Sequence, residues 1–477
     1  RRRAVGMSAG SREASDPIAV LAPVAPDGTW LVGGALRDRL LGRPTNDFDV
    51  VVASAPEPLA RALAREARAY AFALSEEFGV WRVVSRRDGW QVDMLPVEGD
   101  TIEEDLGRRD FTINAIAEPV GGGERVDPFD GLGDLAAERL RMVSPDAFQR
   151  DPLRTMRLAR LGAELNFTAD PGTQGAAAGA ASGLAAVAPE RVFGELKRIV
   201  ASDRALEGLG LMDAVGATGV VLPELVELRG VEQSRYHHLD VFEHTRAVLA
   251  EVIALERDPE PAFAEHAGAV LRLLEQPLAD GLSRGEALRF GALLHDIAKP
   301  QTRGVTAEGR VTFIGHDRAG AELATALFGR LRASERLAQY VAALTRHHLR
   351  LGFLVHQVPL DRRTVYRYLH ATAPVQVDVI ALSVADRLAT RGSGSEEAIA
   401  KHLLLARQLL GEALAWLEDP PRPPLRGDEL ARALGIGPGP EIGRILGQLE
   451  EDSFAGEVQT PEQAVERARK LLATGGR

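Results

Sequence analysis

The spacing of apolar and polar residues divides the chain into an α/β first part and a helical remainder. In the first part, short apolar runs and two-residue alternation are typical of strands. An Arg87-Asp88-Gly89 turn between two such runs indicates a hairpin, because Asp-Gly fits tight turns between strands. The pattern predicts strands at 30–32, 47–52, 81–84 and 90–95 and a helix at 35–41.

From about residue 144 the pattern is helical almost to the last residue. Prolines at 145, 152 and 189 mark helix starts, because proline is tolerated in the first helical turn. Residues 176–188 are rich in alanine and glycine and predict a loosely packed helix. A Pro-Pro-Arg-Pro-Pro run at 420–424 predicts a stiff linker before a helical stretch at 428–472.

These patterns predict a multidomain fold of the α/β plus all-α class. We expect a flexible leader at 1–27, an α/β head at 28–140, a helical neck and body at 141–235, a histidine-rich helical domain at 236–395 and a helical tail at 396–477.

Composition narrows the range of functions. The 477 residues carry 57 basic and 68 acidic side chains, a net charge of −11, which excludes binding of nucleic acid by bulk positive charge. Any nucleic-acid contact must use local patches. The absence of cysteine excludes disulfides, zinc knuckles, iron–sulfur clusters and thiol catalysis. No stretch reads as a membrane span or a signal peptide, so we expect a cytoplasmic enzyme without a membrane partner.

Glycines and acidic residues in the head form its sharpest motif. Gly33-Gly34 lies between a strand and a helix, where glycine lets backbone N–H groups approach a phosphate. Arg37, one turn into the helix, can add charge-assisted hydrogen bonds. Asp47 and Asp49 are two apart on a strand, so both point to one face and can bind Mg²⁺. Asp93, on a later strand, is a candidate third oxygen ligand.

A second motif covers residues 104–115. Its paired arginines, Arg108 and Arg109, can clamp a triphosphate. Asp110 and Asn114 are one helical turn apart and can bond a ribose or order the loop. On local evidence alone, a salt-bridged helix start explains these residues equally well.

A third motif repeats polar residues every three positions at Asp151, Arg154, Arg157 and Arg160. This spacing predicts one broad stripe along a helix. Asp151 accepts and Arg154 donates hydrogen bonds, and such a pair can read the Watson–Crick edge of a base. Standing alone, the stripe is better explained by an ordinary solvated face.

Histidines and acidic residues gather in the middle of the chain. His295-Asp296 follows an apolar run and is expected on a buried helix. Imidazole with carboxylate suits Mn²⁺, Ni²⁺, Fe²⁺ or Zn²⁺ better than Ca²⁺, and a bound water made more acidic can attack a phosphate ester. The candidate metal ligands are His244, His295, Asp296, His316, His347, His348 and Asp386.

Taken together, the head motifs resemble the class II tRNA nucleotidyltransferase (CCA-adding enzyme) and bacterial poly(A) polymerase family. That family's signature is Gly-Gly-x-x-Arg-Asp with Asp-x-Asp, then Arg-Arg-Asp-Phe-Thr-x-Asn-Ala, then Glu-Asp-x-x-Arg. The histidine-rich part resembles the HD metal-dependent phosphohydrolase superfamily. The resemblance implies a polymerase-β-like nucleotidyltransferase head, a helical neck and body, and an α-helical HD domain.

The resemblance also implies roles for individual residues. Asp47 and Asp49 would hold catalytic Mg²⁺ ions, with Asp93 beside them, and Asp151 with Arg154 would act as a protein template for CTP and ATP. The remaining nucleotide-binding candidates are Gly33, Gly34, Arg37, Arg108, Arg109, Asp110, Asn114, Arg157 and Arg160. The implied activity is addition of C and A to the tRNA acceptor end, with Ni²⁺ or Mn²⁺ in the HD domain. Whether the protein is a monomer or a homodimer stays open.

Two departures from the family pattern stand out. Arg150 occupies the position before the templating aspartate, where the family usually has glutamate. The segment between the strand ending at Leu95 and Arg108 is also short, whereas many family members carry a long flexible loop there. Because that loop is linked to switching from C to A addition in the family, its shortness leaves a CC-adding specialist open.

Three other functions remain as alternatives. A poly(A) polymerase of the same family would share the motifs. A phosphohydrolase whose head only binds nucleotide is disfavoured by the intact Asp47 and Asp49. A non-catalytic RNA-binding protein is disfavoured by the acidic charge balance.

Overall fold

The computed structural model describes residues 16–233, 239–391 and 395–474. The chain forms two compact units: residues 1–187 with 210–217, and residues 188–209 with 218–477. Most of the predicted leader lies outside the described residues. Within those residues, no helix is both long and apolar enough to cross a membrane.

The head is built on a six-stranded sheet of order β3-β4-β5-β2-β1-β6. β2 and β5 are parallel neighbours, and the other pairs are antiparallel. The predicted strands are confirmed, whereas β3 and β6 were not predicted. The strands are β1 (Thr29–Val32), β2 (Asp47–Val52), β3 (Tyr70–Ser75), β4 (Val80–Ser85), β5 (Trp90–Pro96) and β6 (Ala117–Pro119).

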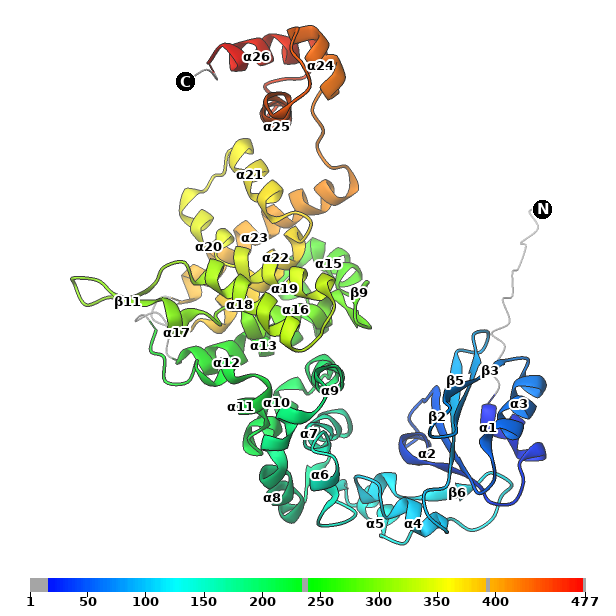
Figure 1. Cartoon of the computed structure of the whole chain (residues 1–477). Coiled ribbons are helices and arrows are strands. Elements are labelled where there is room, and N and C mark those ends of the chain that lie inside the picture. Colours follow the sequence, from blue (N-terminus) through cyan, green and yellow to red (C-terminus); the bar gives the residue numbers. More distant parts are fainter. Residues whose placement is uncertain (1–15, 234–238, 392–394, 475–477) are drawn as a thin grey trace, which may run out of the picture. The chain divides into compact units, whose positions relative to one another are not determined.

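Helices cover the two faces of this sheet differently. α3 packs on β4 and α1 packs on α3. Both helices lie beside the sheet in Figure 1. This side of the sheet buries Phe48, Val50 and Val52. On the opposite face, α4 closes a small apolar cluster over only one part of the sheet. The head helices are α1 (Pro17–Leu21), α2 (Gly33–Leu40), α3 (Pro56–Ala67), α4 (Ile102–Leu106), the 3₁₀ turn η2 (Thr112–Asn114) and α5 (Gly131–Ala136).

Short helices follow the head, as predicted. The alanine-rich stretch is helical in two pieces, α8 and the 3₁₀ segment η3 (Ala181–Ala186). A two-stranded parallel pair, β7 (Arg139–Leu140) and β8 (Thr168–Ala169), precedes them. The helices are α6 (Ala147–Arg150), α7 (Arg154–Leu165), α8 (Pro171–Ala180), α9 (Pro189–Ala201), α10 (Ala205–Ala214), α11 (Ala217–Val221) and α12 (Pro223–Val226).

The histidine-rich region is a helical body in which α13 packs on α16 and α22, and α19 packs on α16 and α18. Two small hairpins, β9 (Pro277–Ala279) with β10 (Leu282–Ser283) and β11 (Arg303–Val305) with β12 (Val311–Phe313), interrupt it. Its helices are α13 (Val241–Arg257), α14 (Glu260–Phe263), α15 (Ala267–Leu274), α16 (Arg284–Leu294), α17 (Lys299–Thr302), α18 (His316–Arg330), α19 (Glu335–His347), α20 (Arg350–Leu354), α21 (Arg362–Thr372), α22 (Gln376–Ala389) and α23 (Ser395–Glu418).

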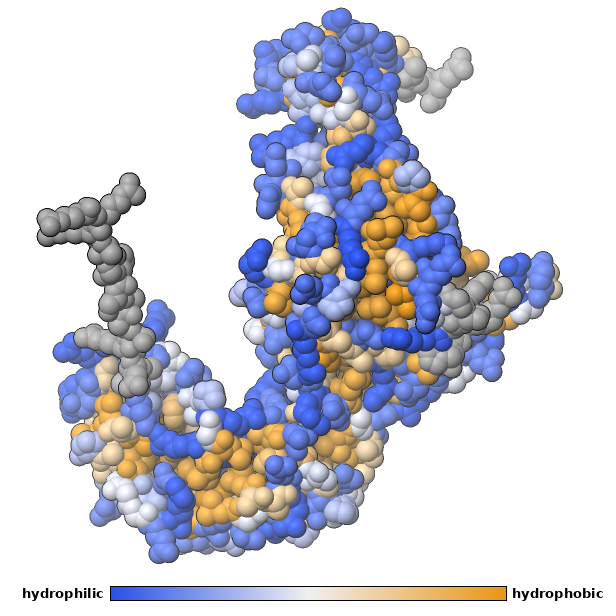
Figure 2. Space-filling model, turned by 180° about the vertical axis from the view of Figure 1, so that it is seen from behind, coloured by the Kyte–Doolittle hydropathy of each residue, from blue (hydrophilic) through white to orange (hydrophobic). Residues whose placement is uncertain are grey.

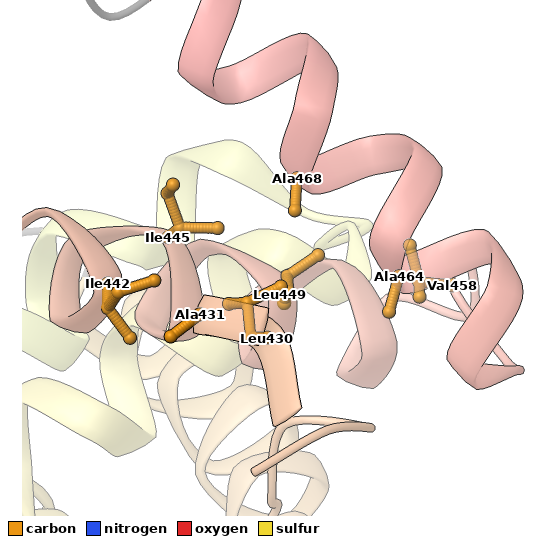
Figure 3. Packing of buried hydrophobic residues seen from close by; sticks show 8 residues of the cluster. All are labelled: Leu430, Ala431, Ile442, Ile445, Leu449, Val458, Ala464 and Ala468. Carbon is orange, nitrogen blue, oxygen red and sulfur yellow. The ribbon is translucent and has the colours of Figure 1, made fainter. Parts of the chain in front are cut away.

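The last three helices, to which the name tail is restricted from here on, form a group with its own core. They are α24 (Gly427–Leu434), α25 (Pro440–Phe454) and α26 (Pro461–Thr474). Leu430, Ile445 and Leu449 are fully buried at its centre, where the three helices meet (Figure 3). Hydrophilic residues cover most of its outer surface in the view of Figure 2. The tail therefore buries its apolar side chains internally, as the helical pattern predicted.

Candidate active site and candidate metal centre

Three carboxylates share one face of the head sheet. In the parallel pair of β2 and β5, Asp49 lies directly opposite Asp93 and Asp47 lies opposite Gln91. Directly paired residues project to the same face, as do residues two apart on one strand. The structure therefore brings together Asp47, Asp49 and Asp93, with Asp47 exposed and the other two half-buried.

This arrangement perturbs Asp49. Burial raises the pKa of Asp49 to about 6; Asp47 and Asp93 add to the rise, while Arg109 and Arg157 oppose it. A cluster of carboxylates that repel one another is stabilised by a divalent cation, and oxygen ligands of this kind suit Mg²⁺. The donor set therefore fits the metal that the sequence predicted.

Asp93 differs from the other two because an arginine already binds it. Arg82 on β4 donates to both of its oxygens, Nε to Oδ1 at 2.6 Å and Nη2 to Oδ2 at 2.7 Å. Asp47 accepts one hydrogen bond from the Gln91 amide at 2.7 Å. Asp47 and Asp49 thus have more lone pairs available to a cation than Asp93, each of whose oxygens already accepts a hydrogen bond from Arg82.

Gly33 brings the backbone close to the carboxylates. It has a φ of +69°, and a Cβ there would lie 3.2 Å from both Asp49 Oδ2 and Arg109 Nη1. Any other residue would be strained and would crowd both groups. At Gly34 a Cβ would make only ordinary contact with Arg37. The N-terminal end of α2 therefore lies beside the acidic face, which suits an anionic phosphate.

The second motif is an internal network. Arg37 is buried and donates to Asn114 Oδ1 at 2.8 Å and to both Asp38 oxygens, so it orders the loop in this structure. Asn114 in turn donates to Asp110 Oδ1 at 3.0 Å. Burial would raise the pKa of Asp110, but Arg157 and the Asn114 amide outweigh it and hold that pKa below its usual value.

The paired arginines have different environments. Arg109 is held by Asp105 Oδ1, from Nε at 3.1 Å and Nη2 at 2.9 Å, which fixes it beside Gly33. Arg108 is more than half exposed, with Glu98 3.6 Å away. One arginine is therefore positioned at the carboxylates and the other faces solvent.

The third motif is not the single helical stripe that its spacing predicted. Asp151 lies ahead of α7, where it ends α6 and accepts from the Leu153 backbone N–H. Arg160 is buried and bonds Glu164 at 2.8 Å. The helix starts only at Arg154, so the three-residue repeat crosses a break in the helix.

Arg154 connects this helix to the second motif. Its guanidinium donates to the carbonyl oxygens of Arg108 at 2.6 Å, Arg109 at 3.0 Å and Ala147 at 3.2 Å. Arg157, one turn on, lies 3.4 Å from Asp110 Oδ2. In this structure both arginines therefore position the arginine-bearing loop.

Six buried or partly buried side chains meet in the helical body. Their ligand atoms form two groups, each within 4.8 Å: His244, His295 and Asp386, and Asp296, His316 and His348. The sequence predicted His295 and Asp296 on a buried helix, but in the structure they follow the end of α16. The structure does not bring His347 to either group; its Nδ1 accepts from Arg350 Nε at 2.8 Å.

Three of these histidines have a defined tautomer. In each, Nδ1 lies close to the carbonyl oxygen three residues earlier, and a carbonyl can only accept, so Nδ1 carries a proton and Nε2 is the nitrogen that can bind a metal when the ring is neutral. The pairs are His295 with Ala292 (2.8 Å), His316 with Phe313 (2.6 Å) and His348 with Thr345 (2.7 Å). His316 Nε2 and His348 Nε2 then face each other at 3.3 Å, an arrangement that a cation between them relieves.

Asp296 lies between the two groups. Its Oδ1 is 3.3 Å from His316 Nε2, and its Oδ2 is 3.2 Å from His295 Nε2. Lys299, which sequence reasoning missed, places Nζ 2.6 Å from Oδ2. Burial would raise the pKa of Asp296, but His295 and Lys299 outweigh it and hold that pKa well below its usual value. A buried, ionised carboxylate among imidazoles fits a transition metal.

Comparisons with known proteins agree with this geometry. Residues 29–141 match the family described as poly A polymerase head domain, 166–228 the probable RNA- and SrmB-binding site of polymerase A, and 241–391 the HD domain. The chain is 38% identical over 451 residues to an A-adding tRNA nucleotidyltransferase of Deinococcus radiodurans, covering 93% of this chain and 95% of that one.

The chain belongs to the tRNA nucleotidyltransferase and poly(A) polymerase family. It is also 36% identical over 462 residues to a CC-adding tRNA nucleotidyltransferase of Thermus thermophilus, with 95% of each chain covered. A solved structure of the Thermotoga maritima CCA-adding enzyme in complex with tRNA shares the fold, with a TM-score of 0.61, 18% identity and coverage of 96% and 97%. The predicted nucleotidyltransferase head, helical region and HD domain are thus confirmed, and family members of this kind are nucleotidyltransferases. The five domain boundaries stay a prediction.

Proposed function

We propose that this protein adds nucleotides from CTP and ATP to the 3′ end of tRNA and releases pyrophosphate. The observation that carries the proposal is the meeting of Asp47 and Asp49 with Gly33, the start of α2 and Arg109. The carboxylates that could bind a metal lie there beside backbone N–H groups and the Arg109 guanidinium, both of which could bind phosphates. Its relatives with A-adding and CC-adding names support the same substrate class.

The residues divide this work among themselves. Asp47 and Asp49 would hold Mg²⁺, which supplies positive charge to the attacking and leaving oxygens of phosphoryl transfer. The backbone at Gly33 and the N-terminal end of α2 orient the triphosphate. Arg109, held by Asp105, compensates the negative charge that the phosphates bring to Asp49.

Base selection is proposed for Asp151 and Arg154. In the present structure Arg154 is engaged with three backbone carbonyls. Reading a base would require it to exchange at least one of these bonds for the base edge. That exchange would couple recognition of the nucleotide to the position of the loop that carries Arg109.

The test uses a tRNA transcript that lacks its 3′ CCA, with Mg²⁺ and CTP, ATP or both. Products are resolved at single-nucleotide length. Two C additions with CTP and a final A with both nucleotides are expected for a complete CCA-adding enzyme. Long A tracts without CTP would instead mean a poly(A) polymerase, and no extension under any condition would overturn the proposal.

A second candidate is an enzyme that performs only part of the addition. Only residues 97–101 separate β5 from α4, so the long loop of many family members has no room there. The A-adding and CC-adding names of the two relatives above agree with such specialisation. Arrest after CC would identify a CC-adding enzyme, and addition of a single A only to tRNA already ending in CC would identify an A-adding one.

For the helical body we propose a transition-metal centre, with Ni²⁺ or Mn²⁺ as candidates, that hydrolyses phosphate esters. The facing Nε2 atoms of His316 and His348 and the central Asp296 support it. Metal content of the purified protein should fall in His295→Ala and stay normal in the control His347→Ala, whose side chain lies outside both groups. Equal metal content in His295→Ala and the parent would overturn the metal centre.

A further inference from the structure

The edge strand of the head sheet carries large aromatic side chains into solvent. Among the strands of the described residues, β3 pairs only with β4, and Tyr70 and Phe72 on it are 68% and 46% exposed. Soluble proteins usually bury such residues, and exposed aromatic groups near a functional site often mark a binding surface.

Strand register places these aromatics on the face that bears the carboxylates. Phe72 pairs with Arg82 on β4, Arg82 pairs with Asp93 on β5, and Asp93 pairs with Asp49 on β2. Paired side chains share a face, so one unbroken row runs from Phe72 to Asp49. Tyr70 begins the neighbouring row, through Val84 and Gln91 to Asp47. Three strand spacings of roughly 4.8 Å set the rows' length at about 14 Å.

Helices cover other parts of both faces of the sheet. On the opposite face α3 packs on β4, and the guanidinium of Arg61 lies over Trp81 at 5.4 Å. On the carboxylate face, Val32 and Val51 are buried by Ile102 and Leu106 of α4. Tyr70 and Phe72 are thus outside both apolar layers, at the uncovered end of the catalytic face.

The charges on this surface favour a nucleic acid. Arg86 lies over the ring of Tyr70 at 6.0 Å, and Arg82 stands between Phe72 and Asp93. Aromatic faces flanked by arginines are typical of surfaces that stack single-stranded bases and attract their phosphates. Stacking also tolerates any base, which suits an RNA end whose sequence changes with each addition.

We propose that Tyr70 and Phe72 stack against the unpaired nucleotides at the 3′ end of the RNA and align its terminal hydroxyl with Asp49. The inference rests on the proposed function and assigns positioning residues to it. Arg86 provides the accompanying charge for the RNA phosphates. Binding of the nucleoside triphosphate uses the Gly33 side of the site and does not involve Tyr70 or Phe72.

The test compares two double variants of the full-length protein: Tyr70→Leu with Phe72→Leu, which loses the rings, and Tyr70→Phe with Phe72→Tyr, which keeps them. A tRNA that ends after the first C of its CCA carries a fluorescent adenine analogue as the nucleotide before that C, because the rings lie about 14 Å from the carboxylates, and stacking quenches the fluorescence. We expect the leucine variant to lose the quenching and raise the KM for tRNA about tenfold or more, with an unchanged KM for CTP. The aromatic variant should match the parent.

Three outcomes overturn the inference. If the leucine variant quenches and extends tRNA like the parent while the parent is active, the inference fails alone. If RNA binding is unchanged but the leucine variant alters the sedimentation of the protein, the surface is a protein interface. If the parent extends no RNA, the proposed function fails and the inference fails with it. Thermal unfolding of both variants confirms that they fold.

Discussion

Burial and neighbouring carboxylates raise the pKa of Asp49 to about 6, well above the value of a free aspartate. Asp49 therefore costs the metal-free protein stability once it ionises. An acid whose folded pKa is raised contributes full stability below the unfolded pKa near 4, and that contribution disappears as the pH rises through about 6.

This sign gives a prediction for Asp49→Asn. Nucleotide addition should fall at least about a thousandfold, because the charge that holds the metal is removed. The metal-free variant should nevertheless be more stable than the parent at pH 7.5, by about 1 to 2 kcal/mol, and equally stable at pH 4. Chemical denaturation at both pH values measures this, with the exposed Asp100→Asn as control. A variant less stable than the parent at pH 7.5 would contradict the origin given for the shifted pKa.

Gly33 gives a second prediction at the same scale. Gly33→Ala should lose about 1 kcal/mol of stability, from the left-handed backbone, and reduce nucleotide addition roughly tenfold or more by displacing Asp49 and Arg109. Gly42→Ala is a matched control, because Gly42 has a φ of +68° and no atom within 4 Å of an added Cβ. It should lose similar stability and keep full activity. Equal activity loss in both variants would show strain, rather than crowding, as the cause.

Residues of the candidate site were predictable where the sequence places them close together. Gly33, Asp47 and Asp49 lie within one strand–helix–strand segment and share a recognisable spacing. Arg82 and Lys299 were missed because their partners are set by sheet register and by the turn after α16. Burial also sets partners that the sequence did not predict, as for Arg37, which bonds Asp38 and Asn114 in the structure, while its nucleotide-binding role stays a prediction.

At the scale of elements, β3 was missed although Tyr70 to Leu74 alternates aromatic or aliphatic residues with alanine. Its large side chains face solvent and its small ones face the sheet core, the reverse of the usual burial pattern. The repeat from Asp151 to Arg160 gave the opposite error, because it predicted one continuous helical stripe. Pro152 lies in the break between α6 and α7, inside the repeat. The spacing of hydrophobic residues predicts an element reliably when its hydrophobic side chains are the buried ones.

The contact between α21 and the tail gives a prediction about elements. Asp452 is fully buried and accepts from Arg363 at 2.5 Å and Arg467 at 2.7 Å. Burial would raise the pKa of Asp452, but hydrogen bonds from Arg467, Gln448 and Arg363 outweigh it and lower that pKa. A lowered pKa contributes stability above the unfolded value near 4, and that stability is lost as the pH falls further.

Asp452→Asn should therefore destabilise the attachment of the tail by about 2 kcal/mol at pH 7, and by progressively less as the pH falls below the unfolded value near 4. Limited tryptic cleavage after Arg426, which unlike Arg422 is not followed by proline, measures the attachment at pH 7, and chemical denaturation at lower pH follows its pH dependence. Asp428→Asn removes an exposed carboxylate of the same three-helix group and should leave cleavage unchanged. Faster cleavage in that control would point to general weakening of the tail.

For the whole molecule, the two units predict two unfolding transitions in calorimetry. A chelator selective for transition metals should lower the midpoint temperature of only one transition, that of the unit formed by residues 188–209 and 218–477. The six clustered ligands all belong to this unit. Nucleotide addition assayed with Mg²⁺ should stay unchanged. His295→Ala should not respond to the chelator, and a shift of both transitions would contradict separate metal sites.

The sequence predicted the order of the parts but not how they combine into units. Composition and motifs separated the head, the histidine-rich body and the tail, since each has its own residue pattern. The short helices between residues 188 and 217 have no such signature, and their assignment depends on which core receives each apolar face.

That assignment restricts how the protein can be divided. The chain passes between the units after residues 187, 209 and 217, so no single cut separates them into complete halves. Chimeras that exchange whole units between CC-adding and A-adding relatives must therefore use three junctions, after residues 187, 209 and 217. A single junction would leave residues 188–209 or 210–217 with the wrong core, and loss of activity would then report misfolding rather than nucleotide choice.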